Sequence, residues 1–186
     1  MSAPPLIRRF TVDEYHRMAE AGILHEDDRV ELLDGQIVEM TPIRPEHAGC
    51  VDDLARWFTQ RLGASAVVRV QNPVRLGTHV EPQPDIAVVK ARRAGYRTEH
   101  PGPDDILLII EVADTSLERD RDFKLPLYAQ ALIPEVWLVN LPGDNIQVCR
   151  EPRAGSYAET RTARRGESLT PLLLPGTTLP VDDILG

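Results

Sequence analysis

The segment Ile106–Val112, which reads Ile-Leu-Leu-Ile-Ile-Glu-Val, constrains the fold more than any other part of the sequence. An apolar run of this length is typical of a central strand that is covered on both faces. Its one polar residue, Glu111, stands near the C-terminal end of the run. A buried carboxylate is costly unless a cation, hydrogen-bond donors or a metal ion compensates it. The run therefore predicts a buried strand that carries a functional acid.

Local signals before this run predict two helices and a hairpin. Thr11 and Glu14 match a capping box, which predicts a helix that ends near Ala21 with Gly22 as its stop. Asp34-Gly35 between two apolar-rich runs predicts a β-hairpin. Apolar residues at helical spacing predict a second helix from about residue 46 to residue 62, ended by Gly63.

The remaining pattern predicts strands and one further helix. We expect extended segments over 66–70, 74–76, 85–90, 136–139 and 146–149, a helix over 118–131, and short β-prone pieces near Tyr157 and Leu172. This order of elements predicts the α/β class, with a central mixed β-sheet flanked by helices. The length of 186 residues fits one domain, 1–186, with residues 1–9 as a flexible N-terminal segment.

Charge and cysteine content narrow the possible functions. Lys and Arg number 21 against 29 Asp and Glu, and the resulting net charge of −8 opposes binding to a phosphate backbone. Nuclease chemistry is compatible with this charge if acids cluster around a metal ion and basic residues gather elsewhere. Two arginine groups are candidates, although such groups are more often solvated loop charges: Arg92, Arg93 and Arg97, and Arg161, Arg164 and Arg165.

Other classes are disfavoured by what the sequence lacks. The two cysteines, Cys50 and Cys149, are far apart and have no His or Cys neighbours at metal-ligand spacing, which argues against a zinc site and a disulfide framework. No apolar run approaches the roughly 20 residues that span a bilayer. We therefore expect a cytoplasmic protein that does not bind membranes.

Two further acids stand at positions that suit magnesium. Asp85 begins a predicted strand after Pro82 and Pro84, and Glu31 lies in the first arm of the hairpin. Carboxylate oxygens are hard ligands, and Mg²⁺ binds through one or two of them while keeping places for water and phosphate. Each acid also has an ordinary explanation: Asp85 as a turn or cap residue, and Glu31 as a solvent-facing residue of the hairpin.

Lys124 is the fourth candidate. Asp120, Lys124 and Tyr128 follow one another at four-residue spacing and so share one face of the predicted helix. A fixed ammonium can position a nucleophile and stabilise charge that develops on a phosphate. The alternative is an exposed ion pair between Asp120 and Lys124, which spacing alone favours.

Taken together, these motifs resemble a known family. The ordered set comprises Arg29 to Gly35, His47, Pro84-Asp85, Ile110 to Ser116, Asp120 to Lys124, Tyr128 and Ile133 to Val139. It resembles the Uma-two family of restriction endonucleases, within the PD-(D/E)XK nuclease superfamily, over roughly residues 10 to 185. The resemblance implies a restriction-endonuclease-like fold with a divalent metal at its active edge.

The resemblance also implies roles for single residues. Asp85 corresponds to the metal-binding aspartate, Glu111 to the second acid, and Glu31 to an additional acid ahead of the core motif. The usual lysine two residues after the second acid is absent, because position 113 is Ala, and Lys124 would supply its ammonium from the helix. His47 would contact phosphate or transfer a proton, although a histidine near a helix start is more often a cap or surface residue.

The chain departs from the family pattern at two positions. Pro126 lies inside the predicted helix of Lys124 and removes one backbone donor, which would bend or delay that helix. Asn140 stands where an acid often ends the strand after Trp137.

The leading hypothesis is hydrolysis of DNA phosphodiester bonds. Asp85, Glu111 and Glu31 would hold Mg²⁺, with Mn²⁺ as a substitute, and Lys124 would orient the attacking water. We expect DNA as the substrate, a homodimer, and no organic cofactor. Two alternatives remain: a catalytically silent module that binds protein or nucleic acid on the same fold, and a metal-dependent phosphoesterase with a non-DNA substrate.

Overall fold

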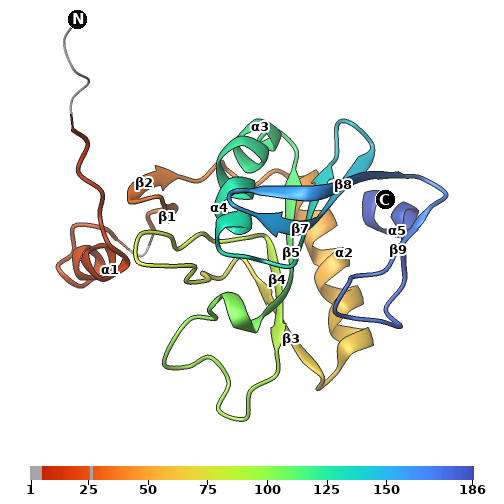
Figure 1. The fold of residues 1–186 in the computed structure, drawn as a ribbon, viewed down its shortest axis with the longest axis horizontal. Helices are drawn as coiled ribbons and strands as arrows, with labels where there is room; N and C mark the ends of the chain where they lie inside the picture. The colour runs from red at the N-terminus through yellow and green to blue at the C-terminus, as the bar shows by residue number, and fades with distance from the viewer. Residues whose placement is uncertain (1–5, 26) are drawn as a thin grey trace, which may run out of the picture.

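Six strands form the central sheet of the computed structural model, which describes residues 6–25 and 27–186 (Figure 1). The strands follow chain order across the sheet: β3 (Ala66–Val70), β4 (Ile86–Lys90), β5 (Ile106–Ala113), β6 (Glu135–Asn140), β7 (Asn145–Arg153) and β8 (Ser156–Arg164). β5 and β6 are parallel, and the other neighbouring pairs of this sheet are antiparallel. All eight residues of β5 are buried, which confirms the predicted central strand.

Helices cover both faces of this sheet, which confirms the predicted fold class. On one face, α2 (Pro45–Leu62) packs Val51, Leu54 and Phe58 against alternate residues of the central strands. On the other face, Tyr128 of α4 (Leu125–Gln130) packs near Ile109. Figure 1 shows α2 on one side of β5 and α4 on the other. Because side chains alternate along a strand, Glu111 points to the same face as Ile109, toward α4.

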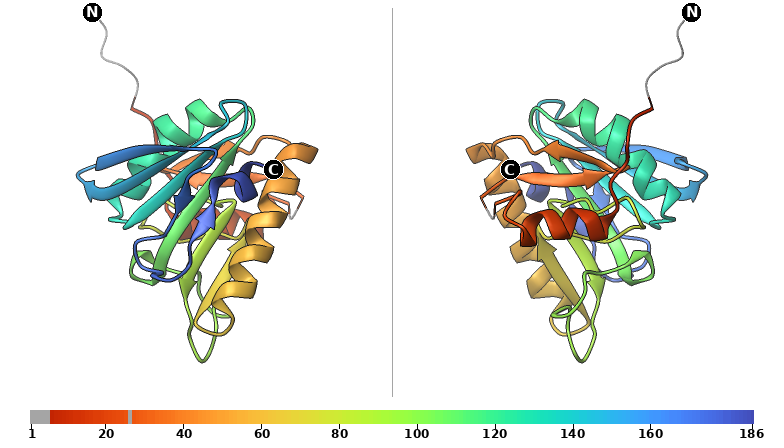
Figure 2. Two further views of the ribbon diagram at one scale, coloured as in Figure 1. Left: turned by 90° about the vertical axis from the view of Figure 1, so that its right-hand side faces the viewer. Right: turned by 90° about the vertical axis from the view of Figure 1, so that its left-hand side faces the viewer.

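The N-terminal elements lie outside the central sheet, at one end of the molecule (Figures 1 and 2). The capping box of Thr11 and Glu14 begins α1 (Val12–Glu20), as predicted. β1 (Val30–Leu33) and β2 (Gln36–Glu39) form the predicted hairpin, and both turn residues, Asp34 and Gly35, have positive φ. β1 and β2 make a two-stranded sheet that is separate from the central sheet. A single antiparallel bridge, between Leu32 and Glu81, connects β1 to the segment before β4.

The connection from β5 to β6 differs most from the sequence prediction. A parallel pair needs a crossover, and residues 114–134 provide it. In place of one helix over 118–131, the chain forms α3 (Leu117–Arg119), a π-helical turn η2 (Asp120–Lys124) and then α4. The N–H of Leu125 donates to Asp120 O, five residues back. Pro126 cannot donate an N–H group, and it stands at the second residue of α4, where an α-helix tolerates proline.

Several predicted segments outside the crossover also require correction. Residues 74–76 form no strand, although the N–H of Val74 donates to Pro82 O and that of Leu76 to Val80 O. The piece near Tyr157 is the nine-residue strand β8, whereas Leu172 lies in a turn. Four short elements were not predicted: the 3₁₀ turn η1 (Pro103–Asp105), the paired strands β9 (Ser168–Leu169) and β10 (Leu179–Pro180), and α5 (Val181–Leu185).

The predicted flexible segment 1–9 lies partly outside the described residues, which begin at Leu6. Within the described part, Arg8 pairs with Glu14, and Arg9 pairs with Asp34 of the hairpin turn. No helix in the described part of the chain is both long enough and apolar enough to cross a membrane.

Candidate active site

Asp85 lies immediately before β4, beside the end of β5. Its Oδ2 accepts a hydrogen bond of 2.8 Å from the backbone N–H of Val112, and its Oδ1 accepts one of 3.2 Å from the Gln71 amide. His47 Nε2 lies 3.1 Å from Oδ2. Burial raises the pKa of Asp85, but His47 and the donors from Val112 and Gln71 outweigh it, so the pKa lies below its usual range. Asp85 is therefore an ionised carboxylate that is held by His47 of α2, by Gln71 after β3 and by Val112 of β5.

Glu111 is 2% exposed and accepts hydrogen bonds from three elements. Its Oε2 accepts the backbone N–H of Asp85 at 3.3 Å. Its Oε1 accepts the Tyr128 hydroxyl at 2.5 Å and the Lys124 ammonium at 3.3 Å. The donors that a carboxylate in a buried strand requires are thus supplied by the start of β4 and by the crossover.

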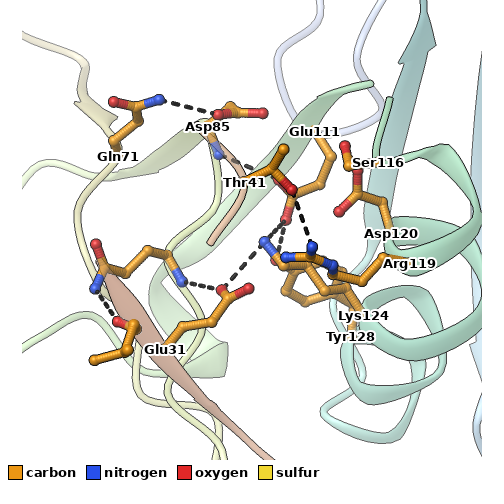
Figure 3. A network of polar contacts seen from close by, with 12 residues as sticks. Glu31, Thr41, Gln71, Asp85, Glu111, Ser116, Arg119, Asp120, Lys124 and Tyr128 are labelled. Atoms are coloured by element: carbon orange, nitrogen blue, oxygen red, sulfur yellow. Dashed lines mark hydrogen bonds and ion pairs between the residues drawn. The ribbon is translucent and has the colours of Figure 1, made fainter. Parts of the chain in front are cut away.

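Glu31 comes from β1 and meets the same ammonium from the other side (Figure 3). Lys124 Nζ lies 3.1 Å from Glu31 Oε2, which also accepts the backbone N–H of Gln83 at 3.0 Å. Glu31 is 1% exposed and Lys124 is 5% exposed. The ordinary explanations of a solvent-facing Glu31 and of an exposed pair between Asp120 and Lys124 are therefore wrong.

Asp120 adds a further buried carboxylate at the π-helical turn, where its Oδ2 accepts the Ser116 hydroxyl at 2.6 Å. The four acids around Lys124 exceed its single positive charge. Burial, together with the charges of Asp120 and Asp85, raises the pKa of Glu111 from 4.5 to about 8 despite the opposing effect of Lys124. Burial lowers the pKa of Lys124, but Glu111, Glu31 and Asp120 raise it above its ordinary value. This site has an excess of negative charge around a permanently charged lysine.

A small cleft of about 60 Å³ opens over the exposed side of this cluster. Asp85, Asp120, His47 and Gln71 line it, while Glu31, Glu111 and Lys124 lie beneath its surface. Its rim carries three arginines: Arg29, Arg44 and Arg119. Arg44 faces Asp114 at 3.3 Å, and Arg119 donates to Glu39 O and Thr41 Oγ1.

The five residues singled out from the sequence come together in space. Asp85 contacts His47 and Glu111, and Glu111 contacts Lys124, which contacts Glu31. The three carboxylates do not share one coordination sphere, because Lys124 stands between Glu31 and Glu111. Within residues 6–25 and 27–186, three potential ligands whose ligating atoms all lie within 4.8 Å of one another occur elsewhere in the molecule, and none of these three carboxylates belongs to that group. A cation at this site would therefore be held by Asp85 and Glu111, while Glu31 forms its ion pair with Lys124.

Sequence reasoning missed several residues of the site. Gln71 has φ of 48°, a conformation that glutamine rarely adopts, and it is tied to Asp85 by both its backbone N–H and its side-chain amide. Nothing in the sequence near Asn72-Pro73 signals that contact. The rim arginines were also missed, and the two predicted arginine groups are used otherwise: Arg92 pairs with Asp105 and Arg165 with Asp144. Tyr128 could have been found, since its four-residue spacing from Lys124 already placed it on the same face.

Comparison with solved structures identifies a protein that shares the fold of this chain. The crystal structure described as that of a putative nuclease belonging to DUF820, from Anabaena variabilis ATCC 29413, matches with a TM-score of 0.74. The match covers 95% of this chain and 97% of that chain at 17% sequence identity. The two proteins therefore share one mixed α/β fold. Comparison with curated proteins found no match.

Comparison with protein families then identifies the family. Residues 12–182 match Uma2, which is described as "Putative restriction endonuclease". The chain belongs to the Uma2 family, as its sequence motifs predicted.

Proposed function

We propose that this protein is a Mg²⁺-dependent endonuclease that hydrolyses phosphodiester bonds in DNA. The observation that carries the proposal is the contact chain from Asp85 through Glu111 to Lys124. It places two buried carboxylates and one buried ammonium at a solvent-accessible cleft, which Asp85 lines and beneath which Glu111 and Lys124 lie. The family and the fold support a nuclease-like enzyme, and the four acids around Lys124 support a metal-dependent one.

The donor set fits magnesium. Asp85 and Glu111 supply carboxylate oxygens, the backbone N–H of Asp85 donates to Glu111 Oε2, and the cleft leaves room for water, which matches the way Mg²⁺ binds in proteins. Mn²⁺ accepts the same ligands. When bound, the cation would supply Lewis-acid polarisation of the phosphate. The pKa of Glu111 is raised first by burial and then by the charges of Asp120 and Asp85, and a divalent cation would neutralise those charges.

The chain's own residues would prepare the attack. Lys124, held by Glu31 and Glu111, presents a positive charge that stabilises the charge developing on phosphorus-bound oxygens. Glu31 fixes that ammonium in position. The His47 ring lies at the cleft, where it can contact phosphate or accept a proton, and its hydrogen bond to Asp85 raises its pKa. The rim arginines Arg29, Arg44 and Arg119 would contact the DNA backbone.

Two sites are needed to cut both strands of a duplex in one encounter, and we propose a homodimer on this ground. Sedimentation of the purified protein with and without a short duplex tests it.

The decisive experiment combines metal titration with DNA nicking. Mg²⁺ and Mn²⁺ are titrated by calorimetry into the wild type, Glu111→Ala and the matched control Glu159→Ala, which removes an exposed acid of β8. Plasmid nicking is followed on the same samples. We expect wild type and control to bind metal and nick DNA, and Glu111→Ala to do neither while it keeps its circular dichroism spectrum.

Other results would redirect the assignment. Absence of metal binding at millimolar concentration with DNA present would contradict the proposal and favour the silent interaction module. Competition by free nucleotides, with no effect of short DNA, would indicate a phosphoesterase with another substrate.

A further inference from the structure

A second cluster of metal-ligating side chains lines a different cleft. His16 comes from α1, Glu81 from the segment bridged to β1, and His100 from the loop between β4 and β5. One ligand atom from each lies within 4.8 Å of the others. This cleft, of about 570 Å³, shares no lining residue with the cleft over Asp85.

We propose that His16, Glu81 and His100 bind one transition-metal ion, with Zn²⁺ as the best-matched ion. Two imidazoles and one carboxylate form a donor set that zinc accepts, with a fourth place open to water. The same set disfavours Mg²⁺, which prefers oxygen ligands alone. The low cysteine content bears on thiolate zinc sites only, so it does not oppose a site built from histidine and glutamate.

Unpaired polar atoms point to a missing partner at this cluster. Glu81 is 3% exposed, and its Oε1 lies 2.6 Å from His16 Nε2. Its other oxygen, Oε2, is buried without a hydrogen-bond partner, and so is His100 Nδ1. A buried carboxylate oxygen and a buried ring nitrogen are each costly to leave unpaired. A cation between them would satisfy both.

Neighbouring charges permit a cation here. Two of the arginines that line the same cleft are already paired, Arg75 with Asp13 at 2.8 Å and Arg92 with Asp105 and Glu99, and Arg97, which also lines it, is exposed.

Metal binding at this cluster would join three segments that are distant in sequence. His16 and Glu81 are 65 residues apart, and His100 follows in a loop that contributes no strand to the sheet. The ion would fix α1 against the loop between β4 and β5. The site is therefore structural in its effect, and it is independent of the proposed Mg²⁺ site.

The test uses zinc binding to the full chain and needs no DNA, so its outcome is independent of the nuclease proposal. Zn²⁺ is titrated by calorimetry into the wild type, the double variant His16→Gln/His100→Gln and the control His25→Gln, which alters an exposed histidine. We expect one Zn²⁺ per chain in the wild type and in the control. In the double variant the affinity should fall by at least ~100-fold, since each ligand of a structural zinc contributes several kcal/mol.

A second titration, into Glu111→Ala, separates the two metal sites. Zinc affinity that is retained there places the ion outside the Asp85 and Glu111 cleft, and zinc affinity lost with Glu111 would overturn the proposal. Equal zinc affinity of wild type and double variant would overturn it as well.

A measurement on the wild type alone guards against a double variant that fails to fold. The chain has five histidines, so their side-chain ¹⁵N resonances can be followed individually. Saturating Zn²⁺ should shift the rings of His16 and His100 and leave those of His25 and His79 in place. Shifts confined to other rings, or no shifts at all, would refute the site.

Discussion

Replacing Lys124 by methionine should destabilise the protein strongly, and more at high pH than at low pH. The variant keeps the length of the side chain and removes its charge. It leaves Glu31 and Glu111, both nearly inaccessible to solvent, without the ammonium that lies 3.1 and 3.3 Å from them. The chain contains one other lysine, Lys90, which is exposed at the end of β4 and provides the matched control.

The magnitude follows from these contacts. At an effective dielectric constant of about 20, each charge pair at this separation is worth roughly 5 kcal/mol before desolvation is subtracted. Breaking a buried pair by removing one partner costs about 3–5 kcal/mol in practice. The pKa of Glu111, already about 8, will rise further without Lys124, so at pH 6.5 this carboxyl is neutral and part of the loss is avoided. The loss is larger near pH 8.5, because Glu111 of the wild type is then mostly ionised and paired with Lys124, whereas the variant must keep Glu111 protonated or bury its charge without a partner.

The assay is urea unfolding followed by circular dichroism at pH 6.5 and pH 8.5, in EDTA so that no metal contributes. Lys124→Met should lose about 3–5 kcal/mol of unfolding free energy at the higher pH, and clearly less at the lower pH. Lys90→Met should stay within about 0.5 kcal/mol of wild type at both. A Lys124→Met variant as stable as Lys90→Met at pH 8.5 would refute the buried contacts of the ammonium.

Three further outcomes test the site more finely. Tyr128→Phe removes the hydroxyl that donates to Glu111 and should cost about 1.5–3 kcal/mol of unfolding free energy, measured by urea titration; an unchanged midpoint would contradict that bond. Mg²⁺ binding should release up to one proton and strengthen up to about tenfold per pH unit below pH 8, because the carboxyl of Glu111 must ionise to bind metal. Calorimetry in two buffers of different ionisation enthalpy measures that proton, and equal heats would argue against Glu111 as a ligand. His47→Ala should reduce nicking by about 10²-fold if the ring transfers a proton, while thermal unfolding stays near that of wild type; full activity would exclude a chemical role for His47.

The sequence predicted the elements that depend on local interactions. The capping box of Thr11 and Glu14, the Asp34-Gly35 turn and the apolar run of β5 each act within a few residues, and all three are present. The mixed sheet flanked by helices followed from their order. Of the candidate site, Asp85, Glu111, Glu31 and Lys124 were identified because their positions could be matched to the motifs of a family.

Features that depend on distant contacts could not be predicted. The hairpin contacts the rest of the protein through distant partners, such as the bridge from Leu32 to Glu81 and the ion pair of Glu31 with Lys124, which no local pattern reveals. In the π-helical turn at Asp120 to Lys124, the backbone hydrogen bond spans five residues, whereas in an α-helix it spans four. Apolar spacing cannot detect that difference over five residues. The cluster of His16, Glu81 and His100 draws its members from three segments, so no spacing between ligands signals it.

The separate hairpin has a consequence for the order in which the site is completed. Glu111 and Lys124 are 13 residues apart, and Asp85 and Glu111 are 26 apart, so closing the sheet and its crossover brings these three together early. Glu31 lies nearer the N-terminus, on β1 of the hairpin, and the hairpin shares no β-ladder with the central sheet. Local opening of the N-terminal segment would release Glu31 from Lys124 while the remaining acids stay in place. The fraction of molecules in which Glu31 contacts Lys124 is thus set by the free energy with which one hairpin docks. The rate of amide hydrogen exchange in β1 should measure that free energy directly.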